Sequence, residues 1–188
     1  IMKFKIGKNK IGNGEKVYFI ADIAANHDGD IKRAFKLIEL AKESGADAAK
    51  FQHHDVSRYV SDFGFKSLKK KMSHQKKWKK SIFEVYKDAE VPTIWTKALK
   101  KKCNQIGIDF FSTPFDEESV DYLESIAVDI YKVASFDVVN HQLLKYLANT
   151  GKTIIMSVGM ANLEEIKKAY EIIGKNTDKI VILHCISS

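Results

Sequence analysis

Chargeable and hydroxyl-bearing side chains stand at or near the carboxyl ends of successive apolar runs in this sequence. They are Asp22, Lys50, Gln52, Ser112, Thr113, Lys132, Ser135, Asp137, Ser157 and His184. Two lysines with several hydroxyl donors suit a small substrate that carries phosphate and carboxylate groups. A histidine at the rim could bind a divalent metal that polarises a carbonyl group. Asp22 or Asp137 could transfer protons.

The placement of Lys50 is the most informative of these. By period-two alternation, Ala48, Lys50 and Gln52 share one face of a strand. This predicts that Lys50 points into the interior, where a lysine is costly unless it meets an anion. That anion is either part of a substrate or the carboxylate of Asp22, in a structural ion pair.

The other candidates also have structural explanations. Ser112, Thr113 and Ser157 could be turn or capping residues. His184 could be a core histidine with satisfied hydrogen bonds, and Cys185 is expected to point away from His184 and to serve packing alone. The functional interpretation is favoured because all of the candidates converge on the same end of successive strands, where barrels of parallel strands build their sites.

The elements that must position these residues alternate regularly along the chain. Short apolar runs indicate strands at residues 17–24, 46–52, 109–113, 129–135, 153–158 and 180–185. Longer amphipathic stretches indicate helices at residues 31–44, 93–106, 117–126, 141–150 and 163–173. Strands that alternate with helices predict a single unit of the α/β class, with a parallel sheet and helices outside it.

Residues that typically cap helices support these helix boundaries. Gly45, Gly107, Gly151 and Gly174 each follow a predicted helix, where a left-handed C-terminal cap favours glycine. Asn162 precedes two glutamates and is predicted to cap the last helix. Residues 56–92 are the least regular part of the sequence, and they are predicted to form a long insertion that covers a site.

An open dinucleotide-binding sheet would show the same alternation as a barrel. Such a fold carries GxGxxG after its first strand, whereas residues 24–29 read AANHDG here. The sequence also lacks the GxxxxGK[ST] loop of nucleotide-binding proteins. Both nucleotide-binding classes are therefore disfavoured, and a barrel is preferred.

Composition excludes several other classes of protein. The net charge of +7 comes mostly from lysines at residues 66–80 and 97–102, which alternate with apolar residues as on solvated helix faces. Arginine, the usual residue of base and phosphate recognition, is scarce, so no nucleic-acid partner is expected. The sequence shows neither a membrane-spanning stretch nor a secretory signal, and Cys103 and Cys185 are too far apart in sequence to form a CxxC pair. A cytoplasmic location is expected.

Six short segments resemble the N-acetylneuraminate (sialic acid) synthase family, in the order and spacing of that family. They are residues 21–29 (ADIAANHDG), 45–52 (GADAAKFQ), 112–116 (STPFD), 131–135 (YKVAS), 157–160 (SVGM) and 184–188 (HCISS). The resemblance extends from about residue 18 to residue 188 and implies a (β/α)8 TIM barrel. It further implies condensation of phosphoenolpyruvate with N-acetylmannosamine or a related amino sugar, a divalent metal (Mn²⁺ or Mg²⁺) and a homodimer.

The resemblance also assigns roles by position. It implies that phosphoenolpyruvate is bound by Lys50, Thr113, Lys132, Ser135 and Ser157. Gln52 and Asp137 match residues beside the sugar, and His184 matches a metal ligand. Catalytic roles are expected for Asp22, Lys50, Lys132 and Asp137, whereas Asn26 and His27 are expected only to shape the site.

Three departures from the family pattern qualify these expectations. Asp22 and Asp137 stand where the family usually has glutamate, which shortens the reach of each carboxylate by one methylene group. The sequence ends after the sixth predicted strand, so a barrel truncated after strand six, without the C-terminal antifreeze-like domain, is expected. The alternatives left open are a pseudaminic or legionaminic acid synthase and a catalytically inactive barrel fragment.

Overall fold

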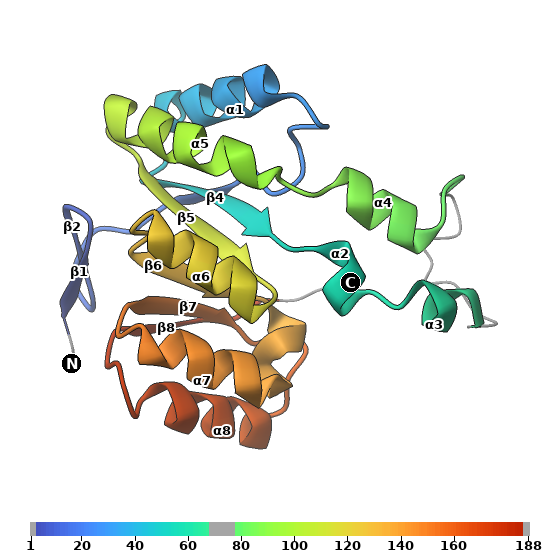
Figure 1. Ribbon diagram of the computed structural model, residues 1–188. Coiled ribbons are helices and arrows are strands. Elements are labelled where there is room, and N and C mark those ends of the chain that lie inside the picture. The colour runs from blue at the N-terminus through green and yellow to red at the C-terminus, as the bar shows by residue number, and fades with distance from the viewer. Residues whose placement is uncertain (1–2, 68–77, 186–188) are drawn as a thin grey trace.

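Six parallel strands form the main sheet of the protein and curve into half of a barrel (Figure 1). The computed structural model describes residues 3–67 and 78–185. The strands, which neighbour one another in chain order, are β3 (Ile20–Asp22), β4 (Ala48–His53), β5 (Asp109–Pro114), β6 (Ile130–Val133), β7 (Thr153–Ser157) and β8 (Ile180–Leu183). Each strand falls on one of the predicted apolar runs, which confirms the parallel α/β architecture.

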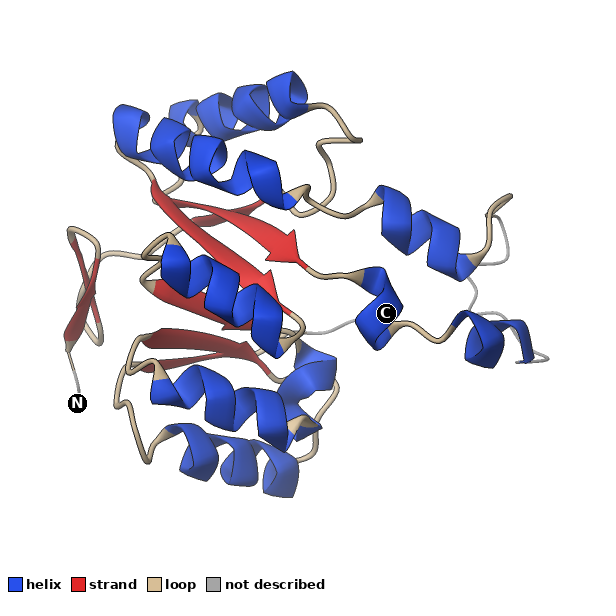
Figure 2. Cartoon of the chain, in the orientation of Figure 1, coloured by secondary structure: helices blue, strands red, loops and turns tan. Residues whose placement is uncertain are grey.

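Five helices connect these strands and cover the outer side of the sheet (Figure 2). They are α1 (Ile31–Glu43), α5 (Thr93–Ile106), α6 (Glu117–Ser125), α7 (His141–Asn149) and α8 (Leu163–Ile173). The predicted capping of α8 is confirmed, because Asn162 accepts hydrogen bonds from the Glu164 and Glu165 amides and Glu165 caps in return. The prediction of a left-handed cap is wrong for Gly174, whose φ of −63° is right-handed helical.

The first strand of the sheet is shorter than the predicted run. Val17 and Phe19 lie before β3, with 71% and 60% of their surfaces exposed. At the other end, the amides of Ile23 and Ala24 both donate to the Lys50 carbonyl, and Ala24 has a φ of +45°. These two hydrogen bonds to one carbonyl group turn the chain out of the strand immediately after Asp22.

The described part of the predicted insertion forms three short helices rather than a loop. These are α2 (Val56–Tyr59), α3 (Asp62–Ser67) and α4 (Ile82–Asp88), and they lie beyond the carboxyl ends of the strands (Figure 1). Val56, Val60 and Ile82 make a small apolar cluster separate from the main core. The insertion therefore stands at the end of the barrel that carries the predicted site, although residues 68–77 of its basic stretch lie outside the described residues.

A hairpin of β1 (Phe4–Ile6) and β2 (Asn9–Ile11) lies at the opposite, amino end of the sheet (Figure 1). Sequence analysis did not predict it, because strands of three residues are too short to show a period. Ile6 is buried in the main core, and Tyr18 donates a hydrogen bond of 2.7 Å to Asp109 nearby. Across the described residues, no helix is both long and apolar enough to cross a membrane.

Candidate active site

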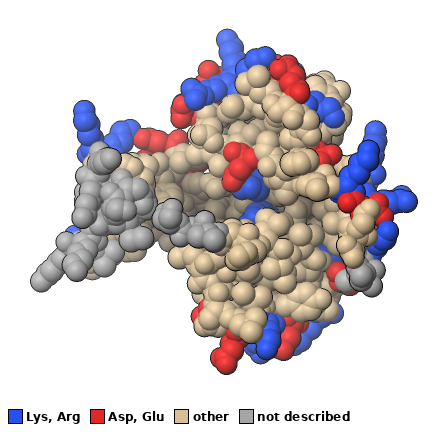
Figure 3. Space-filling view, turned by 180° about the vertical axis from the view of Figure 1, so that it is seen from behind, with Lys and Arg blue, Asp and Glu red and all other residues tan. Residues whose placement is uncertain are grey.

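The strand register brings the predicted inward-facing residues onto one face of the sheet. Asp22 is the Cα partner of Lys50, and Gln52 is the partner of Thr113. Because paired residues of a parallel sheet share a face, these four side chains project toward the interior of the half-barrel. Seen from behind, this open side is hollowed and holds acidic and basic side chains near its centre (Figure 3).

Lys50 forms an ion pair with Asp22 across the first two strands. The distance from Lys50 Nζ to Asp22 Oδ1 is 2.7 Å, with the lysine side chain 10% exposed and the aspartate side chain 58% exposed. The structural alternative raised by the sequence is therefore realised. It does not exclude binding, because the exposed carboxylate leaves the pair open to the solvent side of the site.

Lys132 is the less compensated of the two buried lysines. Its Nζ donates to its neighbour's carbonyl, Val133 O, at 2.6 Å, and no carboxylate lies within ion-pair distance among the described residues. Burial, followed by the nearby charge of Lys50, lowers the pKa of Lys132 to about 8. A buried cation with no carboxylate at ion-pair distance favours an anionic ligand at this position.

Asp137 lies in the short 3₁₀ helix η2 (Ser135–Val139) that follows β6. Its Oδ2 is buried without a hydrogen-bond partner. Burial raises the pKa of this carboxyl to about 6, against lowering contributions from Asn140 and Lys132. An acid with a pKa in this range can both donate and accept a proton near neutral pH.

Replacing Asp137 with Asn is expected to change how stability depends on pH. Burial raises the pKa of Asp137 from 3.8 to about 6, so the folded protein keeps a proton that the unfolded chain releases in this window. Wild-type stability therefore falls as the pH rises from about 4 to about 6, and the D137N variant does not share this component. As the pH rises through that range, the thermal unfolding midpoint of D137N should increase relative to that of wild type. If the midpoints of the two proteins follow parallel curves against pH, the raised pKa of Asp137 is contradicted.

Four neutral polar side chains complete the inward-facing set. Gln52, Ser135 and Ser157 are partly buried, and Thr113 is almost fully buried. Within the described part of the chain, none of these four side chains makes a hydrogen bond to another residue. Hydrogen-bond donors that have no partner among the described residues, beside two buried lysines, are what a site for an oxygen-rich anion requires.

The side chain of Ser112 lies on the opposite face of β5 from that of its neighbour Thr113. Its hydroxyl is 2.6 Å from His53 Nδ1, and His53 Nε2 is 2.6 Å from Thr96 of α5. Burial lowers the pKa of His53 to about 3, so its ring is neutral. This chain of hydrogen bonds ties the sheet to α5 and gives Ser112 a structural role inside β5, which differs from the turn or capping role considered from the sequence.

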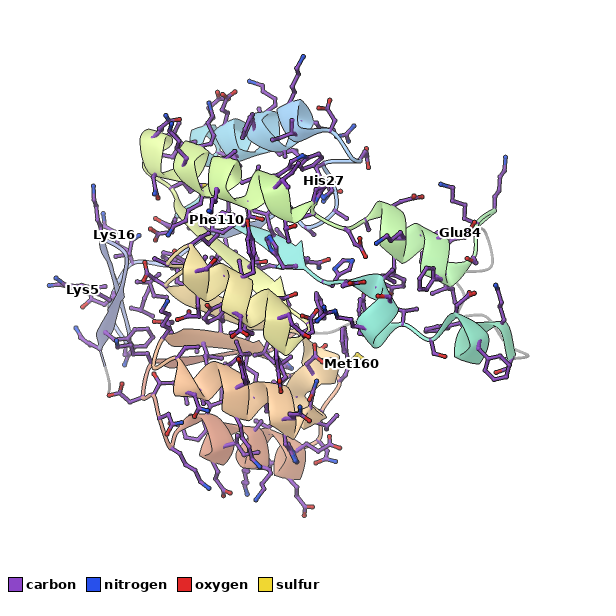
Figure 4. The ribbon with its side chains drawn as sticks, viewed as in Figure 1. Lys5, Lys16, His27, Glu84, Phe110 and Met160 are labelled. Carbon is purple, nitrogen blue, oxygen red and sulfur yellow. The ribbon has the colours of Figure 1, made fainter. Side chains whose placement is uncertain are left out.

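The motif residues after β3 also have structural roles. Asn26 Nδ2 donates to the Ile23 carbonyl at 2.8 Å, and the Gly29 amide donates to His27 Nδ1 at 3.1 Å. His27 is fully buried and contacts Trp95 edge-on, with the ring centroids 5.7 Å apart. In Figure 4, His27 lies beside the start of α5, in the loop that follows Asp22, which agrees with a role in shaping this loop.

His184 lies one residue beyond β8 and is exposed. Leu183 is the Cα partner of Ser157, so strand alternation directs His184 away from the face that carries Ser157. Among residues 3–67 and 78–185, no group of three His, Cys, Asp or Glu side chains could hold a metal ion. The described residues do not fit a metal centre, so Mn²⁺ or Mg²⁺ with His184 as ligand stays a prediction, and residues 186–188 of the same motif lie outside the described residues.

Cys185, which was expected to serve packing alone, lies near Lys132. It also packs tightly against Gly159, where an added Cβ would lie 2.1 Å from the Cys185 carbonyl oxygen. The sequence could have predicted that Cys185 points inward. Cys185 follows Leu183 by two residues, so strand alternation places both side chains on the same face.

The site lies at the end of the molecule that the fold predicts. Figure 4 places Met160, in the loop after β7, and Glu84, in the insertion, at the carboxyl ends of the strands, opposite Lys5 and Lys16 beside the hairpin. The fold therefore defines the class, namely α/β proteins built on half of a parallel barrel. Two buried lysines, an aspartate with a raised pKa and hydroxyl groups without hydrogen-bond partners among the described residues lie at the carboxyl ends of its strands, where such barrels build their sites.

Comparison with known proteins specifies the class further. The NeuB family matches residues 37–188, so the chain belongs to this family. It is 39% identical over 180 residues to N,N'-diacetyllegionaminic acid synthase of Campylobacter jejuni, covering 91% of this chain and 52% of that protein. It is 32% identical over 178 residues to N-acetylneuraminate-9-phosphate synthase of Mus musculus, covering 95% of this chain and 49% of that protein.

A solved structure agrees with these sequence relationships. The N-acetylneuraminic acid synthetase of Leptospira borgpetersenii, in complex with citrate, superposes with a TM-score of 0.86 at 31% identity. The superposition covers 100% of this chain and 60% of that one. The chain thus spans about half the length of the curated relatives it matches.

Proposed function

We propose that the chain forms the phosphoenolpyruvate-binding half of a synthase that condenses phosphoenolpyruvate with an N-acetylated amino sugar. The observation that carries the proposal is the buried Lys132 beside Lys50. Lys132 has no carboxylate at ion-pair distance among the described residues, and the nearby hydroxyl groups make no hydrogen bonds to those residues. A ligand with both a carboxylate and a phosphate would supply two anions to two lysines. The family membership of the chain supports the same ligand.

The chemistry follows from the charges of the site. The enol carbon of phosphoenolpyruvate attacks the open-chain aldehyde of the sugar and forms the new carbon–carbon bond. Water adds to the resulting cationic carbon, and phosphate leaves with cleavage of its carbon–oxygen bond, which gives a nine-carbon 2-keto acid sugar. Lys50 and Lys132 hold the anionic groups, while Asp137, with its pKa of about 6, exchanges a proton with the sugar or water oxygen.

The identity of the sugar is the finer part of the proposal. N-acetylmannosamine is the first candidate, and the diacetylated sugars of legionaminic and pseudaminic acid synthases are the alternatives. Asp22 carries its charge one methylene short of the glutamate usual at this position and is already paired with Lys50. Asp22 is therefore proposed to orient Lys50 in addition to any role in proton transfer.

A phosphate-release assay tests the proposal directly. The chain is supplied with phosphoenolpyruvate, Mn²⁺ and each candidate sugar in turn, and a matched series omits the sugar or the metal. Sugar-dependent release would support a synthase, and the sugar with the highest kcat/KM would identify the substrate. If calorimetry detects phosphoenolpyruvate binding but no phosphate is released, the chain binds one substrate without turnover; absence of binding would contradict the proposal.

Two further parts of the proposal have their own measurements. The homodimer is tested by sedimentation velocity at several protein concentrations. The metal assignment is tested by titrating Mn²⁺ into wild type and H184A, where equal affinities would remove His184 from the ligand set. Neither result changes the assignment of the lysines.

A further inference from the structure

Three aromatic rings form a continuous stack beside the candidate site. Tyr59 of α2 stacks on Phe115, which follows β5, with ring centroids 5.3 Å apart and planes 16° apart. Phe115 in turn stacks on Phe136 of η2 at 5.8 Å and 14°. The aromatic stack, defined as Tyr59, Phe115 and Phe136, therefore links the insertion to the segment that carries Asp137.

The far end of the aromatic stack is held by other rings. His54 contacts Tyr59 and Phe115 edge-on, with centroids 5.3 and 5.6 Å apart. Tyr86 of α4 contacts Tyr59 edge-on at 6.1 Å. His54 is itself buried and lies 3.2 Å from the Tyr86 carbonyl oxygen through its Nε2. Phe115 thus has little freedom to move, so it holds Phe136 from one side.

Phe136 is the open end of the stack. It is 49% exposed, although it lies between Ser135 and Asp137, two residues predicted to contact substrate. One face of its ring packs on Phe115, and about half of the residue remains exposed. A fixed, solvent-facing aromatic ring beside a polar site is a surface suited to a flat or apolar part of a ligand.

The two substrates of the proposed reaction differ in whether they can stack on the ring of Phe136. The face of a phenyl ring carries the negative part of its quadrupole, which repels phosphate and carboxylate groups. Phosphoenolpyruvate is therefore directed to Lys50 and Lys132, away from the stack. The N-acyl group of an amino sugar is planar, uncharged and ends in a methyl group, so it fits the ring.

We propose that Phe136 is a specificity-determining residue that stacks on the N-acyl group of the amino sugar. The inference rests on the proposed function and deepens it, because it names the part of the sugar that the site selects. Asp137, the next residue in the chain, is the proposed proton-exchanging group, so neighbouring residues would bind the acyl group and the reacting oxygen. The stack then connects recognition of the acyl group to the α2–α4 insertion.

Substitution of Phe136 tests this role against a matched residue of the same segment. The F136A variant should raise the KM for the N-acetylated sugar about 3- to 10-fold, the range expected for loss of one aromatic contact. The KM for phosphoenolpyruvate should stay unchanged. F136Y should retain the wild-type KM for the sugar. V139A removes another half-exposed apolar side chain of η2 and should leave both constants unchanged.

Saturation-transfer NMR gives a readout that does not depend on turnover. With phosphoenolpyruvate present, the acetyl methyl protons of N-acetylmannosamine should receive strong saturation from wild type and weak saturation from F136A. Equal saturation by the two proteins would overturn this inference alone, and so would a wild type that binds phosphoenolpyruvate but no sugar. A wild type that binds neither ligand would overturn the proposed function and this inference together.

Discussion

Replacing Lys132 with Met is expected to weaken phosphoenolpyruvate binding about 30- to 4,000-fold, the equivalent of about 2–5 kcal/mol for one member of a buried charge pair. Lys132 is buried, and the nearby positive charge of Lys50 further lowers its pKa. Its pKa of about 8 leaves the ammonium group mostly charged at neutral pH. Methionine keeps much of the volume but removes the ammonium group, with its charge and its hydrogen bond to the Val133 carbonyl, and isothermal titration calorimetry measures the resulting loss of affinity.

The variant K50M should lose less affinity than K132M. Lys50 is already paired with Asp22 at 2.7 Å, so part of its charge is offset before any ligand arrives. K145M is the control, because Lys145 is an exposed lysine on the outer helix α7. Equal affinities for wild type and K132M, or a comparable loss for K145M, would show that Lys132 does not hold the anion.

Much of the half-barrel and of its inward face could be predicted from the sequence. A strand repeats every two residues, so the inward position of Lys50 follows from the alternation around it, and the observed register agrees. The same rule, applied beyond the end of the last strand, would have placed Cys185 inside and His184 outside. Resemblance to the family directed attention to His184 instead.

Contacts between segments far apart in the sequence could not be predicted in the same way. Tyr59, Phe115 and Phe136 come from three segments, and no local period relates them. The partner of His53 likewise depends on how α5 packs against the sheet. Such contacts are set by tertiary packing, and a single sequence carries no local signal for them.

Replacing Gly159 with Ala is expected to lower the free energy of unfolding by about 1–3 kcal/mol, the usual cost of overpacking. A Cβ at this position would lie 2.1 Å from the Cys185 carbonyl oxygen and 2.8 Å from its Sγ. The nearer atom belongs to the backbone, so a rotation of the Cys185 side chain cannot relieve the clash. For a chain of this size, the loss corresponds to roughly 2–12 °C in the thermal midpoint.

The same substitution should also weaken phosphoenolpyruvate binding. Strand β8 has no second neighbour among the described residues, so moving its end outward is the easiest way to relieve the clash. That movement displaces Cys185, which lies near Lys132, and separates the end of β8 from Ser157, the Cα partner of Leu183. G174A is the control, because Gly174 has a helical φ of −63° and its closest neighbour would lie at 3.0 Å. If G159A binds phosphoenolpyruvate as wild type does, then the close packing of the β7 and β8 ends supports the fold alone and does not position the lysine.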